Sequence, residues 1–215
     1  MLTKEDFKDS TILKTKTITL QSYELKASEM YQGRQHLSLM KGLTELREIY
    51  GGGIMDLAII SAGYGLLSED DLIVPYEVTF SKMSPTEIKN LGRELNIKEN
   101  LQRLIANYHM AIFILGDKYL KAIELPLEKI PKDTKLIFIT SESGRKNIRA
   151  EDNCFPILYG QAEAKTFGYT SLELKGYIIK QLCHEIANNG TEILNNIYED
   201  PYCIKNMLKK YEKIK

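Results

Sequence analysis

Residues 135–140 read KLIFIT and pass directly into SESGRK at 141–146. Two further apolar runs have the same form, DLAIIS at 56–61 and MAIFIL at 110–115, and a shorter one occupies residues 155–159. Runs without polar alternation are typical of strands in a parallel sheet that helices cover on both faces. Residues 11–20, where threonine alternates with larger side chains, are predicted as a first strand.

Helical patterns lie between these runs, and several have clear start signals. Ser84-Pro85-Thr86-Glu87 has the order of a capping box with proline at the first helical position, and Thr170-Ser171-Leu172-Glu173 repeats the logic. The expected helices cover residues 24–50 with a break near Gly33, residues 84–107, residues 170–189, and a terminal helix opened by Asp200-Pro201.

The order of strands and helices predicts an α/β fold. We expect a mostly parallel central sheet with helices on both faces, Rossmann-like in arrangement, followed by C-terminal helices. An α+β domain with a mixed sheet is the alternative. The chain is expected to form one domain over residues 1–215, and residues 191–215 could form an appended helical hairpin instead of part of the covering layer.

Composition excludes several classes of protein. The chain has 29 basic and 29 acidic residues, so a globally basic nucleic-acid binder is not expected, although a local patch stays open. Three cysteines without a CxxC pair, and three histidines without an HExxH pattern, predict neither a disulfide framework nor a metal site. No cofactor is expected. The charged N-terminal stretch and the lack of a long apolar window predict a cytoplasmic protein without a membrane span.

Polar residues follow the predicted strands at their carboxyl ends, where an open α/β sheet binds its ligand. They offer hydroxyls, a carboxylate, and glycines that let backbone N–H groups approach an anion. They are Ser61, Gly63, Tyr64 and Gly65 after the first run, Gly116 and Asp117 after the second, and Ser141, Ser143 and Arg145 after the third. On one parallel sheet these residues would line one pocket. A tight turn, a helix N-cap and a solvated turn are the structural alternatives.

Two other stretches add candidates. Glu77 follows Tyr76 in an apolar segment, where desolvation would favour the protonated carboxylic acid and suit acid/base chemistry; a Glu77–arginine ion pair is the alternative. Tyr31, Gly33 and His36 belong to a polar run that interrupts a helical pattern, and such local inconsistencies often mark functional sites.

Residues 27–36 (ASEMYQGRQH) and 56–80 (DLAIISAGYGLLSEDDLIVPYEVTF) resemble two signatures of a group of small bacterial and archaeal domains. The signatures are "A-x-x-L-Y-x-G-x-x-F" and "(I/L)-S-A-x-Y-G-L-(L/I)…(I/L)-x-P-Y-(D/E)-x-T-(L/F)", and the group is similar to the YaaA-like peroxide-stress proteins. The resemblance implies an α/β fold, a cytoplasmic setting and an association with DNA or its protection. The group's "C-S-x-x-K" turn has no cysteine here, where residues 13–17 read LKTKT, so no cysteine-dependent activity is carried over. The helix-hairpin-helix of YaaA has no clear counterpart, which argues against direct binding to duplex DNA.

These observations lead to a nucleotide- or nucleic-acid-associated α/β protein as the first functional hypothesis. As an enzyme it would act on N-glycosidic bonds, with Glu77 or Asp117 stabilising an oxocarbenium-like centre. The predicted substrate-binding residues are Tyr31, Gly33, His36, Ser61, Gly63, Tyr64, Gly65, Tyr76, Ser141, Ser143 and Arg145. One alternative is a noncatalytic nucleic-acid binder that uses the lysines of residues 205–215 and the Arg145-Lys146 loop. Another is an interaction module with a vestigial pocket, and a homo-oligomer is left open.

Overall fold

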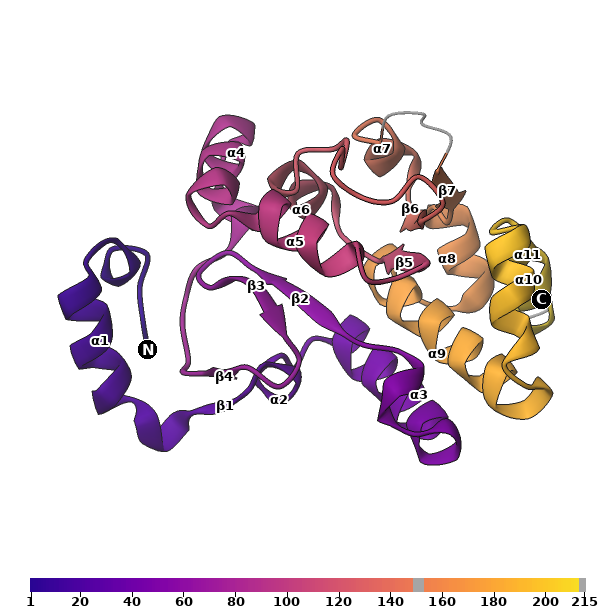
Figure 1. Ribbon diagram of the computed structural model, residues 1–215, viewed down its shortest axis with the longest axis horizontal. Coiled ribbons are helices and arrows are strands. Elements are labelled where there is room, and N and C mark those ends of the chain that lie inside the picture. The colour runs from indigo at the N-terminus through magenta and orange to yellow at the C-terminus, as the bar shows by residue number, and fades with distance from the viewer. Residues whose placement is uncertain (149–152, 213–215) are drawn as a thin grey trace.

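A three-stranded parallel sheet lies at the centre of the protein, which we describe from a computed structural model covering residues 1–148 and 153–212 (Figure 1). Its strands are β5 (Met110–Phe113), β6 (Lys135–Thr140) and β7 (Cys154–Leu158), in the order β5-β6-β7. Phe113 pairs with Phe138, which pairs in turn with Pro156. Three of the four predicted apolar runs therefore form this sheet, and the α/β class is confirmed.

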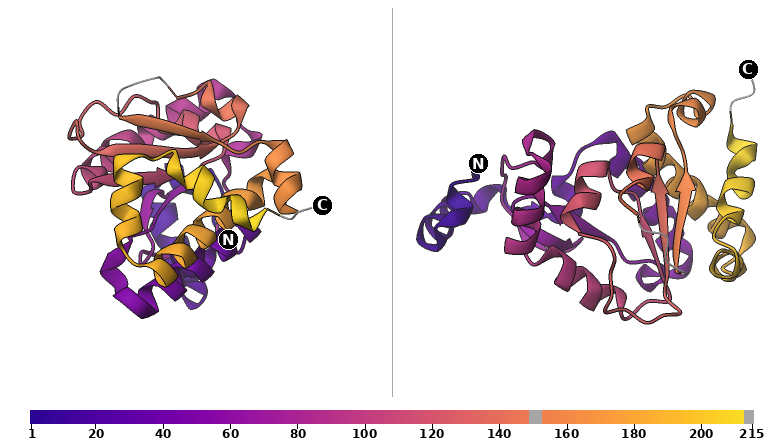
Figure 2. Two further views of the ribbon diagram at one scale, coloured as in Figure 1. Left: turned by 90° about the vertical axis from the view of Figure 1, so that its right-hand side faces the viewer. Right: turned by 90° about the horizontal axis from the view of Figure 1, so that it is seen from above.

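Helices cover both faces of this sheet, as the continuous apolar runs predict. Leu136 and Phe138 of β6 pack into a core with the helices α4 (Pro85–Glu94), α5 (Ile97–Ile105) and α6 (Asp117–Ala122). Ile137 and Ile139 alternate with them and pack on the opposite face, against α3 (Arg34–Tyr50), α8 (Gln161–Phe167) and α9 (Ser171–Asn189). Seen from above, the strands lie between these layers (Figure 2).

The C-terminal helices belong to the same core as α9. They are α10 (Glu192–Glu199) and α11 (Cys203–Leu208), whose buried Ile193, Ile197, Ile204 and Leu208 join it. The remaining elements are short: α2 (Ala27–Met30), α7 (Glu142–Arg145), and 3-10 helices at Asp6–Lys8, Gln21–Tyr23, Gly52–Ile54, Phe80–Lys82 and Lys209–Tyr211. No helix in the described parts of the chain is long and apolar enough to cross a bilayer.

The apolar run at 56–61 lies outside the parallel sheet, which corrects the expectation of one central sheet carrying every run. It forms β2 (Ala58–Ser61), which pairs antiparallel with β3 (Gly65–Ser68). A second antiparallel pair joins β1 (Leu25–Lys26) and β4 (Leu72–Ile73). Only three residues separate β2 from β3, and Gly65 has a φ of 80°, as hairpins with three-residue loops require. The local turn therefore decides the partner of β2.

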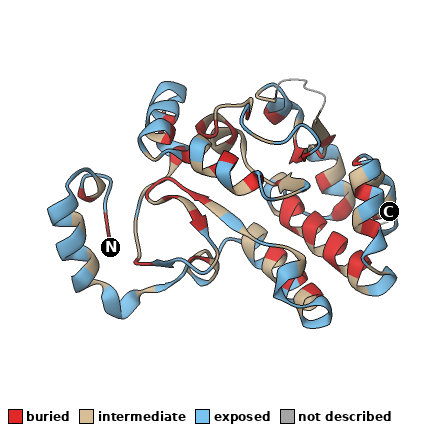
Figure 3. Cartoon of the chain, viewed as in Figure 1, coloured by how far each residue is buried: buried red, intermediate tan, exposed pale blue. Residues whose placement is uncertain are grey.

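The predicted first strand is wrong. Residues 10–19 form the helix α1 (Ser10–Thr19) because the Asp9 side chain caps it, accepting from the N–H groups of Thr11 and Ile12 at 2.8 and 3.0 Å. None of its residues is buried, so no core contact favours a strand (Figure 3). The capping box at Ser84 is confirmed, but the helix predicted over 84–107 is two helices, divided at Asn96, whose φ is 50°.

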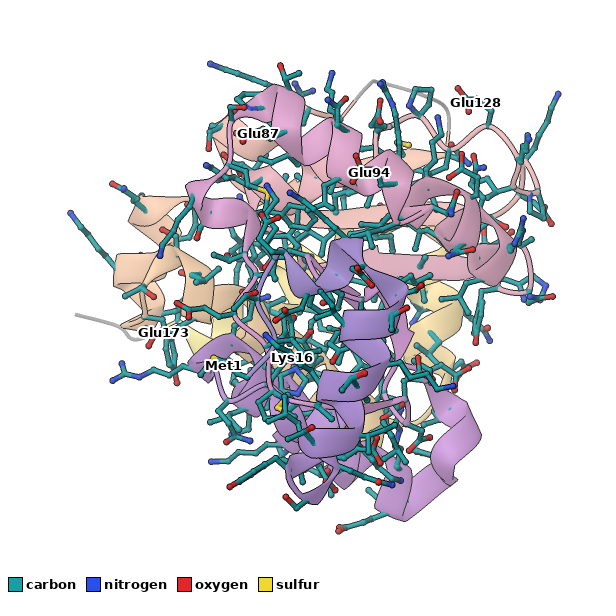
Figure 4. All side chains as sticks on the ribbon, turned by 90° about the vertical axis from the view of Figure 1, so that its left-hand side faces the viewer. Met1, Lys16, Glu87, Glu94, Glu128 and Glu173 are labelled. Atoms are coloured by element: carbon teal, nitrogen blue, oxygen red, sulfur yellow. The ribbon has the colours of Figure 1, made fainter. Side chains whose placement is uncertain are left out.

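Helices α3 and α9 cross at very close range, and glycines allow it. A Cβ on Gly42 would lie 2.6 Å from the Cα of Lys180, and one on Gly176 would overlap the carbonyl oxygen of Gln35. Gly42 thus allows α3 to pack against α9. The helix break expected near Gly33 is confirmed, because α3 begins at Arg34. Arg34 also pairs at 2.8 Å with Glu173 (labelled in Figure 4), and this contact holds the pKa of Glu173 at about 2.

We predict that Gly176→Ala destabilises the fold by about 1–3 kcal/mol, because the added methyl group must push α3 away from α9. Gly53→Ala is the control, since a Cβ there meets no atom within 4 Å. Urea unfolding of both variants measures the difference. Equal unfolding midpoints for the two would contradict this account of the helix crossing.

Candidate functional site

The ends of β5 and β6 bring Asp117, Ser141 and Ser143 together, as predicted. Ser143 Oγ donates to Asp117 Oδ2 at 2.7 Å, and it lies 2.9 Å from Ser141 Oγ. Ser141 also caps α7 by accepting from the N–H of Gly144 at 3.2 Å. The carboxyl edge of the parallel sheet therefore carries a cluster of one carboxylate and two hydroxyls, which we call the strand-end cluster.

Lys175 of α9 adds a buried cation that the sequence reasoning missed. The residue is 5% exposed, and its Nζ donates to the carbonyl oxygen of Leu115, just beyond β5. Burial lowers the pKa of Lys175, and the nearby Asp117 opposes that shift. Within residues 1–148 and 153–212, no carboxylate lies within 4.0 Å of the ammonium group. The sequence signal for the burial of Lys175 is its place in an apolar stretch, directly after Leu174 and three residues before Ile178.

Thr140 provides a second unsatisfied group at the same edge. It ends β6 at 1% exposure, and its Oγ1 has no hydrogen-bond partner among the described residues. A Cβ on Gly144 would collide with this oxygen and would approach Asp117 Oδ1 to 2.8 Å. Thr140 and Asp117 therefore face the same small space beside α7.

Ser61, Tyr76 and Tyr31 form a chain of hydroxyl groups, here called the hydroxyl relay. Ser61 Oγ donates to Tyr76 Oη at 2.8 Å, and Tyr76 Oη lies 2.6 Å from Tyr31 Oη. Ser61 Oγ itself accepts from the backbone N–H groups of Gly63 and Tyr64 at 3.1 and 3.0 Å. The predicted residues Tyr31, Ser61, Gly63, Tyr64 and Tyr76 are thus brought together.

Both relay phenols are neutral at physiological pH. Burial raises the pKa of Tyr31, with hydrogen bonds from Ser61 and Tyr76 opposing it. Burial also raises the pKa of Tyr76, and the adjacent Tyr31 adds to that effect. Each phenol therefore keeps a hydrogen that it can donate.

The N-terminal segment closes one side of the relay. The ring of Phe7 lies edge-on to Tyr64 and Tyr76, with centroids at 5.1 and 6.2 Å. Asp6 anchors the segment through Lys16 (labelled in Figure 4) at 2.7 Å, and this bond lowers the pKa of Asp6 to about 2. Phe7 therefore covers the relay on the side of Tyr64 and Tyr76.

Tyr31 lies next to His36 and the first turn of α3. The two rings are 5.9 Å apart, and His36 Nε2 lies 2.7 Å from the carbonyl oxygen of Ser28. Gln35 donates from Nε2 to the carbonyl oxygen of Ile114 at 2.9 Å, which ties this turn to the end of β5. Gly33, the N-cap of α3, is exposed.

The single pocket expected from the strand ends rests on a wrong premise. Ser61 ends a strand of an antiparallel hairpin, whereas Ser141 follows a strand of the parallel sheet. The two clusters flank the first turn of α6, where Asp117 bonds to Ser143 and the Tyr119 ring contacts Phe80 at 5.1 Å. Burial is the main cause of the raised pKa of Tyr31, and the nearby Tyr119 adds a smaller increase.

The environment expected for Glu77 is wrong as well. Its side chain is exposed, and its backbone N–H donates to the carbonyl oxygen of Leu2 at 2.8 Å. The N-terminal segment thus uses the backbone on both sides of Tyr76 and leaves the carboxylate in solvent. Arg145 is exposed on α7.

The lysine-rich tail makes contacts with the protein itself. Lys205 donates to the carbonyl oxygen of Leu158 at 3.2 Å and lies 3.6 Å from Glu163, and Lys210 pairs with Glu185 at 2.7 Å. Residues 213–215 lie outside the described residues. These bonds give Lys205 and Lys210 a structural use, which weakens the case for a nucleic-acid-binding tail.

A surface cavity of about 620 Å³ opens elsewhere, between α4, α5 and α6. Four cations, Lys89, Arg93, Lys98 and Lys121, line it together with Glu99, Glu124 and Glu128. Arg93 pairs with Glu124 at 2.6 Å, and Lys98 with Glu128 (labelled in Figure 4) at 2.9 Å. This paired lining contains none of the residues that the sequence predicts for the site.

The fold and the two clusters define an α/β protein with a polar edge beside its parallel sheet. The family model described as "Family of unknown function (DUF6884)" matches residues 17–147, more than half of the chain, so the chain belongs to this family. Every predicted site residue lies inside the matched segment, whereas Lys175 lies beyond it. No curated protein and no solved structure matches the chain.

Gly65 begins β3 in a backbone conformation that disfavours a side chain. It adopts a φ of 80°, and a Cβ would lie 3.1 Å from the carbonyl oxygen of Leu95. We predict that Gly65→Val costs about 1–3 kcal/mol of folding stability, since a β-branched residue is strained at this φ. Ser68→Val, on the exposed end of β3, should cost much less in thermal unfolding. Equal losses would refute the argument from backbone strain.

Proposed function

We propose that this protein binds a nucleotide at the carboxyl edge of β5 and β6, with the phosphate group beside Lys175. The observation that carries the proposal is the buried ammonium group of Lys175, which a backbone carbonyl contacts but no described carboxylate approaches within 4.0 Å. Asp117 lies near enough to oppose the effect of burial on the pKa of Lys175, but burial prevails. Burying a cation without a counter-charge in contact is costly, and an anionic ligand would reduce that cost.

The surrounding groups suit a phosphorylated sugar. Ser143 donates to Asp117 and Ser141 lies within hydrogen-bond distance of Ser143, so both hydroxyls would turn from these partners to donate to phosphate oxygens. Thr140 Oγ1, at the end of β6, has no described partner. Asp117 can accept hydrogen bonds from ribose hydroxyl groups. Ligands of Rossmann-like sheets bind at this edge, so the proposal extends the Rossmann-like arrangement to this smaller sheet.

For catalysis we propose N-glycosidic hydrolysis with Asp117 as the stabilising carboxylate. Water would attack the anomeric carbon while the bond from that carbon to the base nitrogen breaks, and a carboxylate beside the ring stabilises the positive charge that develops. Asp117 is preferred to Glu77 because it lies in the strand-end cluster, whereas Glu77 points into solvent. The resemblance to YaaA-like proteins and the cytoplasmic setting belong to the same proposal.

Lys175→Met tests the phosphate site. We expect it to weaken the binding of inorganic phosphate and of AMP, GMP and UMP by about tenfold or more in calorimetric titrations, because charged hydrogen bonds contribute about 1.5–3 kcal/mol each. Lys132→Met, at an exposed position, should bind as the wild type does. The fold of Lys175→Met should persist, since the change removes a buried charge.

Phosphate affinity should also fall as the pH rises. Burial places the pKa of Lys175 below the ordinary 10.5, so the ammonium group is lost at lower pH than in free lysine. Unchanged phosphate affinity in Lys175→Met would show that Lys175 serves only to hold the carbonyl of Leu115.

Asp117→Asn separates an enzyme from a binder. We expect it to retain most of the nucleotide affinity and to abolish release of the free base, measured by chromatography, because the amide cannot stabilise a cationic transition state. Asp133→Asn, on the exposed loop before β6, is the control. A wild-type protein that binds nucleotides and releases no base would favour the noncatalytic alternative.

A further inference from the structure

We propose that Tyr31 and His36 bind the lactam edge of a keto nucleobase, which presents an N–H group beside a carbonyl oxygen. The inference rests on the proposed nucleotide ligand for its chemical class, but it uses residues separate from the strand-end cluster.

The direction of the relay follows from which groups must donate. Backbone N–H groups can only donate, so Ser61 Oγ accepts from Gly63 and Tyr64, and its own hydrogen points to Tyr76 Oη. Tyr76 Oη therefore accepts from Ser61, and it lies 2.6 Å from Tyr31 Oη, where either phenol can donate to the other. The hydrogen of Tyr76 has no other described acceptor beside the ring of Phe7, which favours donation to Tyr31 Oη.

Tyr31 stands at the end of this chain. Where Tyr76 donates to it, Tyr31 keeps its own hydrogen, because the only described side chains that bond to it are Ser61 and Tyr76, and Ser61 directs its hydrogen at Tyr76. Hydrogen bonds in series polarise one another, so the terminal hydroxyl is a stronger donor than an isolated phenol. The hydrogen of Tyr31 is thus available to a carbonyl oxygen on a ligand.

His36 supplies the matching acceptor. The carbonyl oxygen of Ser28 can only accept, so the Nε2 atom that lies 2.7 Å from it carries the hydrogen. A hydrogen on Nε2 leaves Nδ1 as the nitrogen that can accept, and no described residue donates to it. A donor on Tyr31 and an acceptor on His36, on rings 5.9 Å apart, complement the C=O and N–H of a lactam.

The surroundings place this pair where a base would lie. Phe7 covers the relay from the side of Tyr64 and Tyr76, so a ligand approaches from Tyr31. Gln35 binds the carbonyl of Ile114, one residue before the carbonyl that Lys175 contacts. The two residues proposed to contact the base, Tyr31 and His36, therefore lie beside the same end of β5 as the proposed phosphate site.

Three nucleosides test the inference: inosine, which has the lactam edge; adenosine, which lacks it; and N1-methylinosine, whose N–H is blocked. Titration of the full chain should show inosine binding at least about tenfold tighter than the other two, the difference that a site built around hydrogen bonds imposes. Nucleosides carry no phosphate, so Lys175→Met should leave this preference intact. Failure here and failure of the phosphate site are therefore separate results.

Tyr31→Phe should remove the preference for inosine and leave the weaker binding of adenosine unchanged, whereas Tyr23→Phe, at a 63% exposed position, should change neither. Ser61→Ala tests the relay direction, because Tyr31 can then donate to Tyr76, and it should reduce the preference for inosine. Carbon-13 labelling of the tyrosine ring carbons should show the Tyr31 signal shifting with inosine. Equal affinities for inosine and adenosine, no nucleoside binding by the folded protein, or an unchanged preference in Tyr31→Phe would overturn the inference.

Discussion

The close crossing of α3 and α9 is the contact on which the arrangement of both polar clusters depends. Gly42 and Gly176 let the two backbones approach, and a side chain at either position would separate them. This crossing sets the first turn of α3 against the end of β5, where Gln35 reaches the carbonyl of Ile114. It also carries Lys175, next to Gly176, to the same strand end. A packing constraint therefore brings together groups that are far apart in the chain.

The two clusters differ in how they treat polar atoms. The hydroxyl relay joins its members in turn, from backbone N–H groups through Ser61 and Tyr76 to Tyr31. Beside the strand-end cluster, by contrast, lie the buried ammonium group of Lys175, with no described carboxylate within 4.0 Å, and the unpartnered oxygen of Thr140. Buried polar groups are normally paired, so those without partners are the positions where a ligand would contribute most.

The match to DUF6884 divides the protein in an informative way. Residues 17–147 contain the hydroxyl relay, Asp117 and both serines, whereas α9 and its lysine follow the matched segment. The segment before residue 17 includes Phe7, which covers the relay. Two residues outside the matched segment therefore contribute to the candidate site: Phe7 covers the hydroxyl relay, and Lys175 adds the buried charge. Both could adapt the site to one ligand.

The sequence by itself determined the parallel strands, the helices on both sides of them and the capped helix starts. These depend on local patterns: continuous apolar runs, capping boxes and the glycine before α3. It also predicted most residues of the two clusters, because hydroxyls and carboxylates at strand ends are visible in the chain. The pairing of β2 with β3 and the helix over residues 10–19 follow from a three-residue turn and from the Asp9 cap, which are local signals present in the sequence. Tertiary structure alone decided that α3 and α9 cross closely at Gly42 and Gly176. It also decided that Glu77 faces solvent while Lys175 is buried, because burial depends on which segments pack together, and that contact joins residues distant in the sequence.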